Sequence, residues 1–173
     1  YAEFVDSKPN RPTGARKKIY LLPIGKFDAA GSPKIDDLRD LAAAFFGLEV
    51  AVLPTHSLQG LTITERINGN TGRRQYLTQD LLSMLGRKLP KDAYCLLGVT
   101  MEDLYPDEKW NFVFGQATLR KRVGIYSFAR NDPRFWDKDA KPVKRAEMLR
   151  DSAHTLVHET AHMFGMQHCI FFS

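Results

Sequence analysis

The chain has 173 residues, of which 43% are hydrophobic, and this is enough for a single domain with its own core. No apolar run approaches the roughly 20 residues that a membrane span needs, and no secretory signal is visible, so we expect no membrane partner. The formal net charge of +5 comes from scattered basic residues without a recognisable nucleic-acid-binding module, which argues against a nucleic-acid partner.

The start of the chain, residues 1–17, contains Pro9, Pro12 and Gly14 and is predicted to form an extended lead-in before one domain at 18–173. Five apolar runs predict β-strands, at 19–24, 48–53, 93–99, 110–118 and 122–128. A loop rich in Thr, Asn and Gly is expected at 55–72.

Three stretches have helical periodicity. Ser32 is expected to cap the first helix, with Pro33 at its first position, and Gly47 to end it. The second helix is predicted near 75–89, and the third is a long helix at about 143–164. The resulting order, βαβαβββα, predicts a mixed α/β fold: a twisted mixed five-stranded sheet, two backing helices and a third helix with a distinct motif.

This motif reads H-E-x-x-H-x-x-G-x-x-H and includes His158, Glu159, His162, Gly165 and His168. Residues four apart lie on one face of a helix, so His158 and His162 can converge on one ion. Gly165 can end the helix in a left-handed conformation and return the chain, which would bring in His168 as a third ligand.

Three neutral imidazoles leave one position open on a tetrahedral zinc ion (Zn²⁺), which is typical of a catalytic site. Glu159 would then act as general base toward the zinc-activated water. His154 continues the row of histidines, but the helical rise places it about 12 Å from His162, too far for one ion. We therefore expect His154 to pack or to make a hydrogen bond beside the site.

Further sequence motifs make the chain resemble a known family of proteins. His168 is followed by Cys169, and upstream stand V-T-M-E-D-L-Y-P at 99–106, N-F-V-F-G-Q-A at 111–117 and R-V-G-I-Y-S-F at 122–128. The sequence from about residue 18 onward resembles the archaemetzincin family of metzincin-clan zinc metallopeptidases. The resemblance implies a zincin-like fold, and substrate binding along an edge strand formed by 110–116 or its neighbour.

In that family the motif continues with further cysteines that bind a second, structural zinc and with a methionine beneath the catalytic metal. Cys169 is the candidate first ligand of that second zinc. The sequence ends at Ser173, where the next cysteine is due, and no methionine follows His168. We therefore expect a clipped chain or an incomplete sequence, with a second zinc only if the missing cysteines are present.

The predicted function is zinc-dependent hydrolysis of peptide bonds in a peptide or protein substrate, by a monomer in the cytoplasm. The cytoplasmic location follows from two cysteines, Cys95 and Cys169, that do not form a disulfide framework. The alternatives are a zinc-bearing peptide-binding module with little or no hydrolysis and a purely structural zinc domain. Aminopeptidase and endopeptidase action both remain open.

Overall fold

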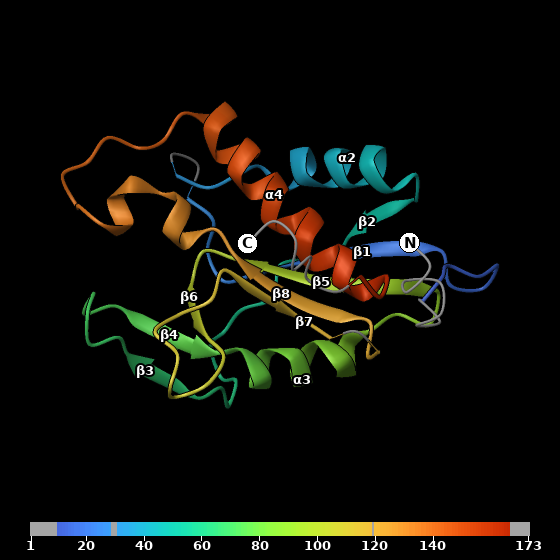
Figure 1. The fold of residues 1–173 in the computed structure, drawn as a ribbon, viewed down its shortest axis with the longest axis horizontal. Coiled ribbons are helices and arrows are strands. Elements are labelled where there is room, and N and C mark those ends of the chain that lie inside the picture. The colour runs from blue at the N-terminus through green and yellow to red at the C-terminus, as the bar shows by residue number, and fades with distance from the viewer. Residues whose placement is uncertain (1–9, 29–30, 119, 167–173) are drawn as a thin grey trace.

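A mixed five-stranded sheet forms the centre of the molecule in the computed structural model, which describes residues 10–28, 31–118 and 120–166 (Figure 1). The strand order is β2 (Val50–Val52), β1 (Lys18–Ile24), β5 (Ala93–Thr100), β8 (Val123–Ser127) and β7 (Gly115–Ala117). The first four strands are parallel, and β7 runs antiparallel to β8. Strands β5 and β8 are buried along their whole length, as expected for parallel strands covered on both faces.

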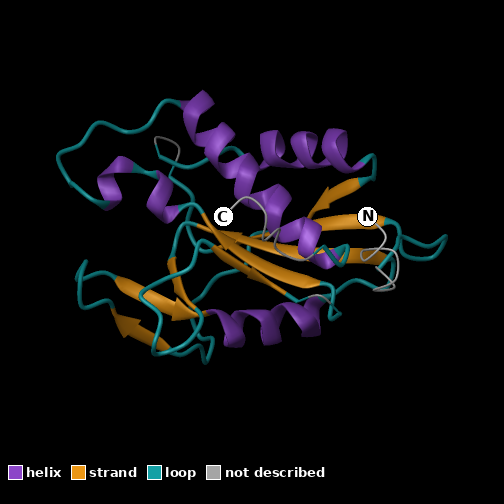
Figure 2. Cartoon of the chain, in the orientation of Figure 1, coloured by secondary structure: helices purple, strands orange, loops and turns teal. Residues whose placement is uncertain are grey.

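Helices cover both faces of this sheet (Figure 2). On one face lie α2 (Ile35–Phe46) and the long α4 (Arg145–Met163), which pack on the sheet through Leu38, Leu156 and Met163. On the other face α3 (Thr78–Lys88) packs through its leucines against Ile125 and neighbouring side chains. The chain therefore builds a three-layer sandwich, with α4 beside the edge of the sheet that ends in β7.

A second, smaller sheet lies beyond the N-terminal end of α3 (Figure 1). It contains β3 (Glu65–Ile67), β4 (Arg74–Leu77) and β6 (Asp103–Tyr105), with β4 between the other two. Two short 3₁₀ helices, η1 (Ala129–Asn131) and η2 (Pro133–Phe135), follow β8.

All five strands of the central sheet were predicted, and the mixed α/β fold with three helices is confirmed. The small sheet was not predicted: β3 interrupts the expected loop at 55–72, β6 was missed, and β4 occupies residues assigned to the second helix, which begins at Thr78 instead of near 75. Only residues 115–117 of the predicted strand at 110–118 belong to the five-stranded sheet. These strands are only three or four residues long, so local periodicity gave little sign of them.

The predicted cap of the first helix is also wrong. The N-cap of α2 is Lys34, whereas Ser32 donates its hydroxyl hydrogen bond to the carbonyl of Asp28. The predicted end is correct, because Gly47 adopts the left-handed conformation at the C-cap. None of the helices in the described part of the chain combines the length and apolarity needed to cross a membrane.

Candidate active site

The last three turns of α4 bring three of the predicted site residues together. Glu159 faces inward and is buried, while His158 is exposed and His162 is half-buried. Leu156, Thr160 and Met163 bury the same helix against the core, so the orientation of the site residues is set by packing.

The two imidazoles are arranged as a pair of metal ligands would be. The Nε2 atoms of His158 and His162 are 3.0 Å apart, and the rings are nearly perpendicular, with centroids 4.6 Å apart. Two nitrogens bound to one tetrahedral zinc at the usual Zn–N bond length lie about 3.3 Å apart. The donor set and its separation therefore fit a zinc ion.

The C-terminal turn of α4 fixes the ring of His162. Gly165 has a φ of 90°, its N–H donates to the carbonyl of His162, and the N–H of Met166 donates to the carbonyl of Ala161. These two bonds form a Schellman motif, as predicted from the glycine. The turn places the carbonyl of Met166 2.7 Å from Nδ1 of His162. Since a carbonyl only accepts, Nδ1 carries the proton, and Nε2, which faces Nε2 of His158, has the lone pair that a metal would use.

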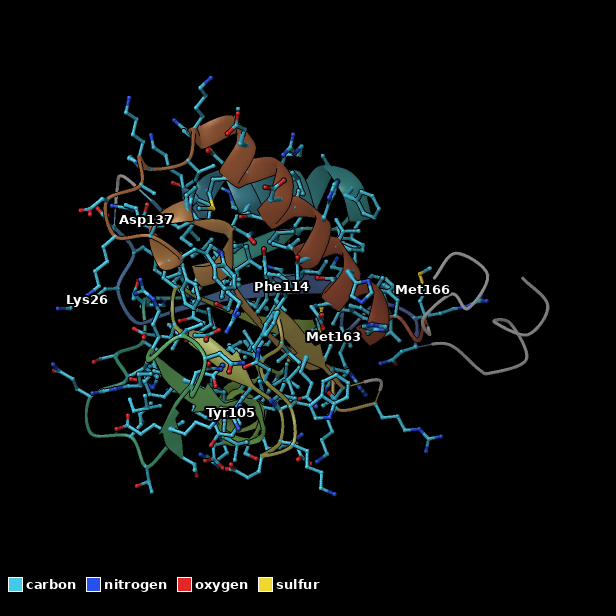
Figure 3. The ribbon with its side chains drawn as sticks, turned by 60° about the vertical axis from the view of Figure 1, so that its left-hand side comes forward. Lys26, Tyr105, Phe114, Asp137, Met163 and Met166 are labelled. Carbon is cyan, nitrogen blue, oxygen red and sulfur yellow. The ribbon has the colours of Figure 1, made fainter. Side chains whose placement is uncertain are left out.

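The same end of the helix is tied to the rest of the domain. The hydroxyl of Tyr94 donates to the carbonyl of Met163 at 3.0 Å and the amide of Asn10 donates to it at 3.5 Å. The ring of Phe164 contacts the rings of Phe46 and Tyr94. Figure 3 shows Met163 and Met166 at this end of α4.

Glu159 lies in an apolar setting against β7. Glu159 is only 6% exposed, and burial raises the pKa of its carboxyl group to about 7. A Cβ atom at Gly115 would lie 2.7 Å from Cγ of Glu159, so the glutamate packs directly on the backbone of that glycine. Proton transfer near neutral pH is favoured by a carboxyl group of this kind.

Gly115 was not singled out in the sequence as part of the site. A glycine inside a predicted strand is a signal for close approach of another group, and this signal was available. Phe114 precedes it, is 43% exposed, and lies beside α4 (Figure 3).

Strand β7 (Gly115–Ala117) forms an edge of the five-stranded sheet, so the edge position predicted for 110–116 is confirmed for Gly115 and Gln116. Its partner on the inner side is β8. The carbonyl of Phe114 accepts a hydrogen bond from Ser127, so the pairing extends one residue before the strand.

Two predicted ligands lie outside the described residues, namely His168 and Cys169. Within the described residues, no three His, Cys, Asp or Glu side chains are grouped to hold a metal ion. The roles of His168 as third ligand and of Cys169 at a second zinc therefore stay predictions. His154 is exposed on α4, so the expected packing is not supported, and the alternative, a hydrogen bond beside the site, stays a prediction.

Two side chains of nucleophilic type, Cys95 and Ser127, are unsuited to a role as nucleophile. Cys95 is fully buried in β5, and burial raises the pKa of its thiol to about 12. The hydroxyl of Ser127 donates to the carbonyl of Glu102 at 2.6 Å and accepts from the N–H of Ala129.

Comparison with known proteins places the chain. Archaemetzincin-2 of Homo sapiens is 33% identical over 192 residues, which cover 96% of this chain and 53% of the relative. The crystal structure of an archaemetzincin from Methanopyrus kandleri superposes with a TM-score of 0.62 at 29% identity, covering 92% of this chain and 79% of that one. The chain belongs to the archaemetzincin family.

No family model matches the chain. A zinc-dependent peptidase from Methanocorpusculum labreanum has a TM-score of 0.66 at 19% identity, over 88% of this chain and 84% of that one, and this likeness shows the fold alone. The chain spans about half the length of the archaemetzincin-2 relatives that it matches. The predicted resemblance and the metzincin-like fold are thus confirmed.

Proposed function

We propose that this archaemetzincin domain hydrolyses peptide bonds with a zinc ion held by His158, His162 and His168. The observation that carries the proposal is the 3.0 Å separation of two imidazole Nε2 atoms beside a buried glutamate. The order of those residues along α4 is the order that the zinc-peptidase motif requires.

Bound zinc would polarise the scissile carbonyl and lower the pKa of a water molecule. Glu159 accepts the proton of the attacking water and returns it to the leaving amine. Its raised pKa suits both steps, because the group exchanges a proton readily near neutral pH. The hydrogen bond from His162 Nδ1 to Met166 keeps the imidazole in the ligating orientation.

The substrate proposed is an extended peptide segment that adds to β7. An edge strand offers backbone donors and acceptors to a peptide, and Gly115 brings this edge into contact with Glu159. A peptide lying along β7 would therefore pass the general base without further rearrangement of the sheet.

The test is cleavage of a mixed peptide library by the zinc-loaded chain, followed by mass spectrometry. We expect cleavage that stops when a chelator removes the metal and returns when zinc is restored. Equal cleavage with and without metal would reject the zinc mechanism. Metal-dependent binding of the peptides without cleavage would favour the peptide-binding module instead.

The positions of the cut sites also separate two reaction classes. Products that begin one residue from the amino terminus of each peptide indicate an aminopeptidase, and internal cuts indicate an endopeptidase. One digest therefore tests both the dependence on metal and the class of peptidase.

A further inference from the structure

The carbonyl oxygen of Asn111 accepts three side-chain hydrogen bonds. The donors are Arg66 Nη2 at 3.1 Å, Asn68 Nδ2 at 3.0 Å and Gln75 Nε2 at 3.0 Å. All three come from the β3–β4 hairpin of the small sheet. A carbonyl has two lone pairs, so three donors saturate this oxygen and hold the backbone at Asn111.

Arg66 also holds the backbone that leads up to that point. Its guanidinium donates to the carbonyls of Glu108 and Trp110 at 3.3 and 2.5 Å, and its Nε donates to Gln75. The same guanidinium lies 3.9 Å from the ring centroid of Tyr105 on β6. A planar guanidinium with five donors is well suited to holding several backbone carbonyls at once.

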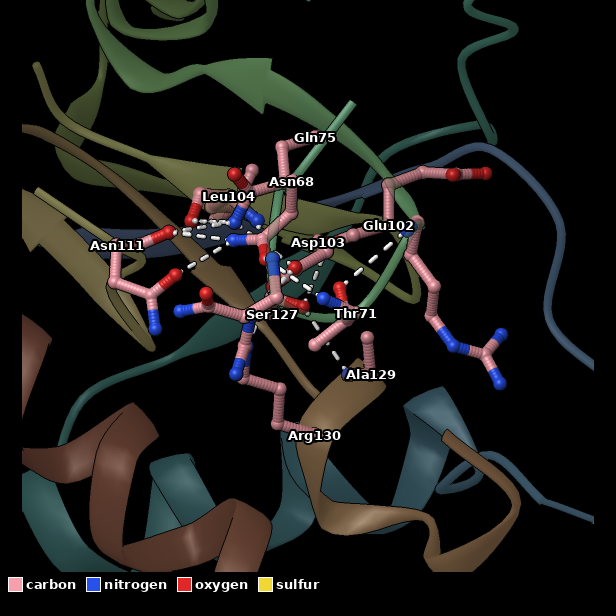
Figure 4. A network of polar contacts seen from close by, with 12 residues as sticks. Asn68, Thr71, Gln75, Glu102, Asp103, Leu104, Asn111, Ser127, Ala129 and Arg130 are labelled. Carbon is pink, nitrogen blue, oxygen red and sulfur yellow. Dashed lines mark hydrogen bonds and ion pairs between the residues drawn. The ribbon is translucent and has the colours of Figure 1, made fainter. Parts of the chain in front are cut away.

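A buried ion pair joins this network to the end of β8 (Figure 4). Arg130 binds Asp103 through two bonds of 2.8 Å, with both side chains 2% exposed, and Gln75 donates to the same carboxylate. The guanidinium of Arg130 stacks on Phe112 at 3.6 Å. Gln75 links this ion pair to the held backbone, because its amide also donates to the carbonyl of Asn111.

The held segment leads directly into the active site. Val113 donates to the carbonyl of Leu104 on β6, the carbonyl of Phe114 accepts from the N–H of Ser127 at the end of β8, and Gly115 touches Glu159. Only residues 112–115 thus separate the carbonyl of Asn111 from the contact between Gly115 and Glu159. Four extended residues span at most about 14 Å, so the held carbonyl and the contact with Glu159 lie on one short stretch of backbone.

We propose that Arg66, Asn68 and Gln75 are positioning residues that set the edge strand β7 for an incoming peptide. This inference rests on the proposed function, because it assigns the small sheet to the binding of the same substrate. The residues act through Asn111 and do not touch the reacting atoms.

The test compares Arg66→Ala with Arg74→Ala. Arg74 lies on the same small sheet, is more exposed than Arg66 and pairs with Glu65 at 3.5 Å, so it is a matched control. Hydrogen exchange and cleavage of a quenched fluorescent octapeptide library are measured on the zinc-loaded chain. Arg66→Lys keeps the positive charge but lacks the planar guanidinium with its five donors. It provides a second variant if Arg66→Ala folds poorly.

We expect faster amide exchange at 111–117 in Arg66→Ala and a KM raised about tenfold with kcat within about twofold, as loss of uniform substrate binding predicts. The exchange rate and KM of Arg66→Lys should lie between those of the wild type and Arg66→Ala. Both quantities in Arg74→Ala should match the wild type. A purely structural role would lower the active fraction, and so kcat, while KM stayed constant. That result, or unchanged exchange at 111–117, would overturn the inference.

If the wild type cleaves no peptide, the proposed function fails, and the dissociation constant for the same library, measured by fluorescence anisotropy, replaces KM. A weaker complex in Arg66→Ala would then still support the positioning role. Equal affinities, or no binding by the wild type, would overturn it.

Discussion

The carboxylate of Glu159 on α4 lies where the side chain of any residue other than glycine at position 115 on β7 would begin. A Cβ at Gly115 would lie 2.7 Å from Cγ and 2.8 Å from Cδ of Glu159, and 2.9 Å from the carbonyl oxygen of Ile125. Real Cβ atoms do not approach other atoms so closely, so one of the two elements would have to move. The helix that carries Glu159, the proposed general base, and the edge of the sheet are thereby held in one fixed relation.

We expect Gly115→Ala to destabilise the fold by about 1–3 kcal/mol, the usual cost of overpacking. Turnover by the zinc-loaded chain should fall by about tenfold or more, because displacement of Glu159 spoils its alignment. The measurements are thermal melting and kcat on a cleaved peptide. Gly86→Ala on α3 is the control, since a Cβ there meets nothing within 4 Å. Wild-type turnover in Gly115→Ala would contradict the contact.

Glu159→Ala should retain zinc and the native fold while hydrolysis falls by about 10²-fold or more, since the change removes the proton carrier but no metal ligand. Zinc content, circular dichroism and turnover are measured together. Unchanged turnover would show that another group is the base. Glu159→Gln, which preserves the packing against Gly115, separates loss of the carboxylate from loss of volume.

The features predicted well from the sequence are those set by local pattern. The motif fixed α4 and its ending at Gly165, because helical spacing and a left-handed glycine are properties of a few neighbouring residues. The strands β5 and β8 were predicted because parallel strands buried on both faces read as continuous apolar runs.

The features missed depend on partners distant in the chain. Gln75 was assigned to a helix, yet it lies in β4 and is held by Asp103, 28 positions away. The backbone from Trp110 to Asn111 was assigned to a strand, yet its carbonyls are satisfied by Arg66, more than 40 positions away. Side-chain bonds to backbone leave no periodicity in the sequence, and the contact of Gly115 with Glu159 leaves only a glycine.

Zinc content should be lost in the double variant His158→Ala, His162→Ala, since the two Nε2 atoms that converge at 3.0 Å are both removed. Elemental analysis of the purified chain gives the metal-to-protein ratio. His154→Ala is the control on the same helix, where the exposed imidazole lies too far along the axis to share the ion. Full zinc content in the double variant would require ligands elsewhere.

Gly165→Ala should weaken zinc binding because it disturbs the hydrogen bond from His162 Nδ1 to the carbonyl of Met166. The φ of 90° at this position costs an alanine about 1–2 kcal/mol. Relief of that strain would move the Met166 carbonyl away from Nδ1 of His162, to which it is now bonded at 2.7 Å. Loss of such a partner typically lowers metal affinity by about 10–100-fold.

Gly47→Ala is the matched control for this prediction. Gly47 ends α2 in the same left-handed conformation, with a φ of 63°, and a Cβ there meets nothing within 4 Å. Both variants should lower the melting temperature of the metal-free chain, because both force an alanine into a left-handed turn. Only Gly165→Ala should also reduce zinc affinity in a competition titration with a chelator. Equal affinities in the two variants would show that the turn ends the helix without orienting His162.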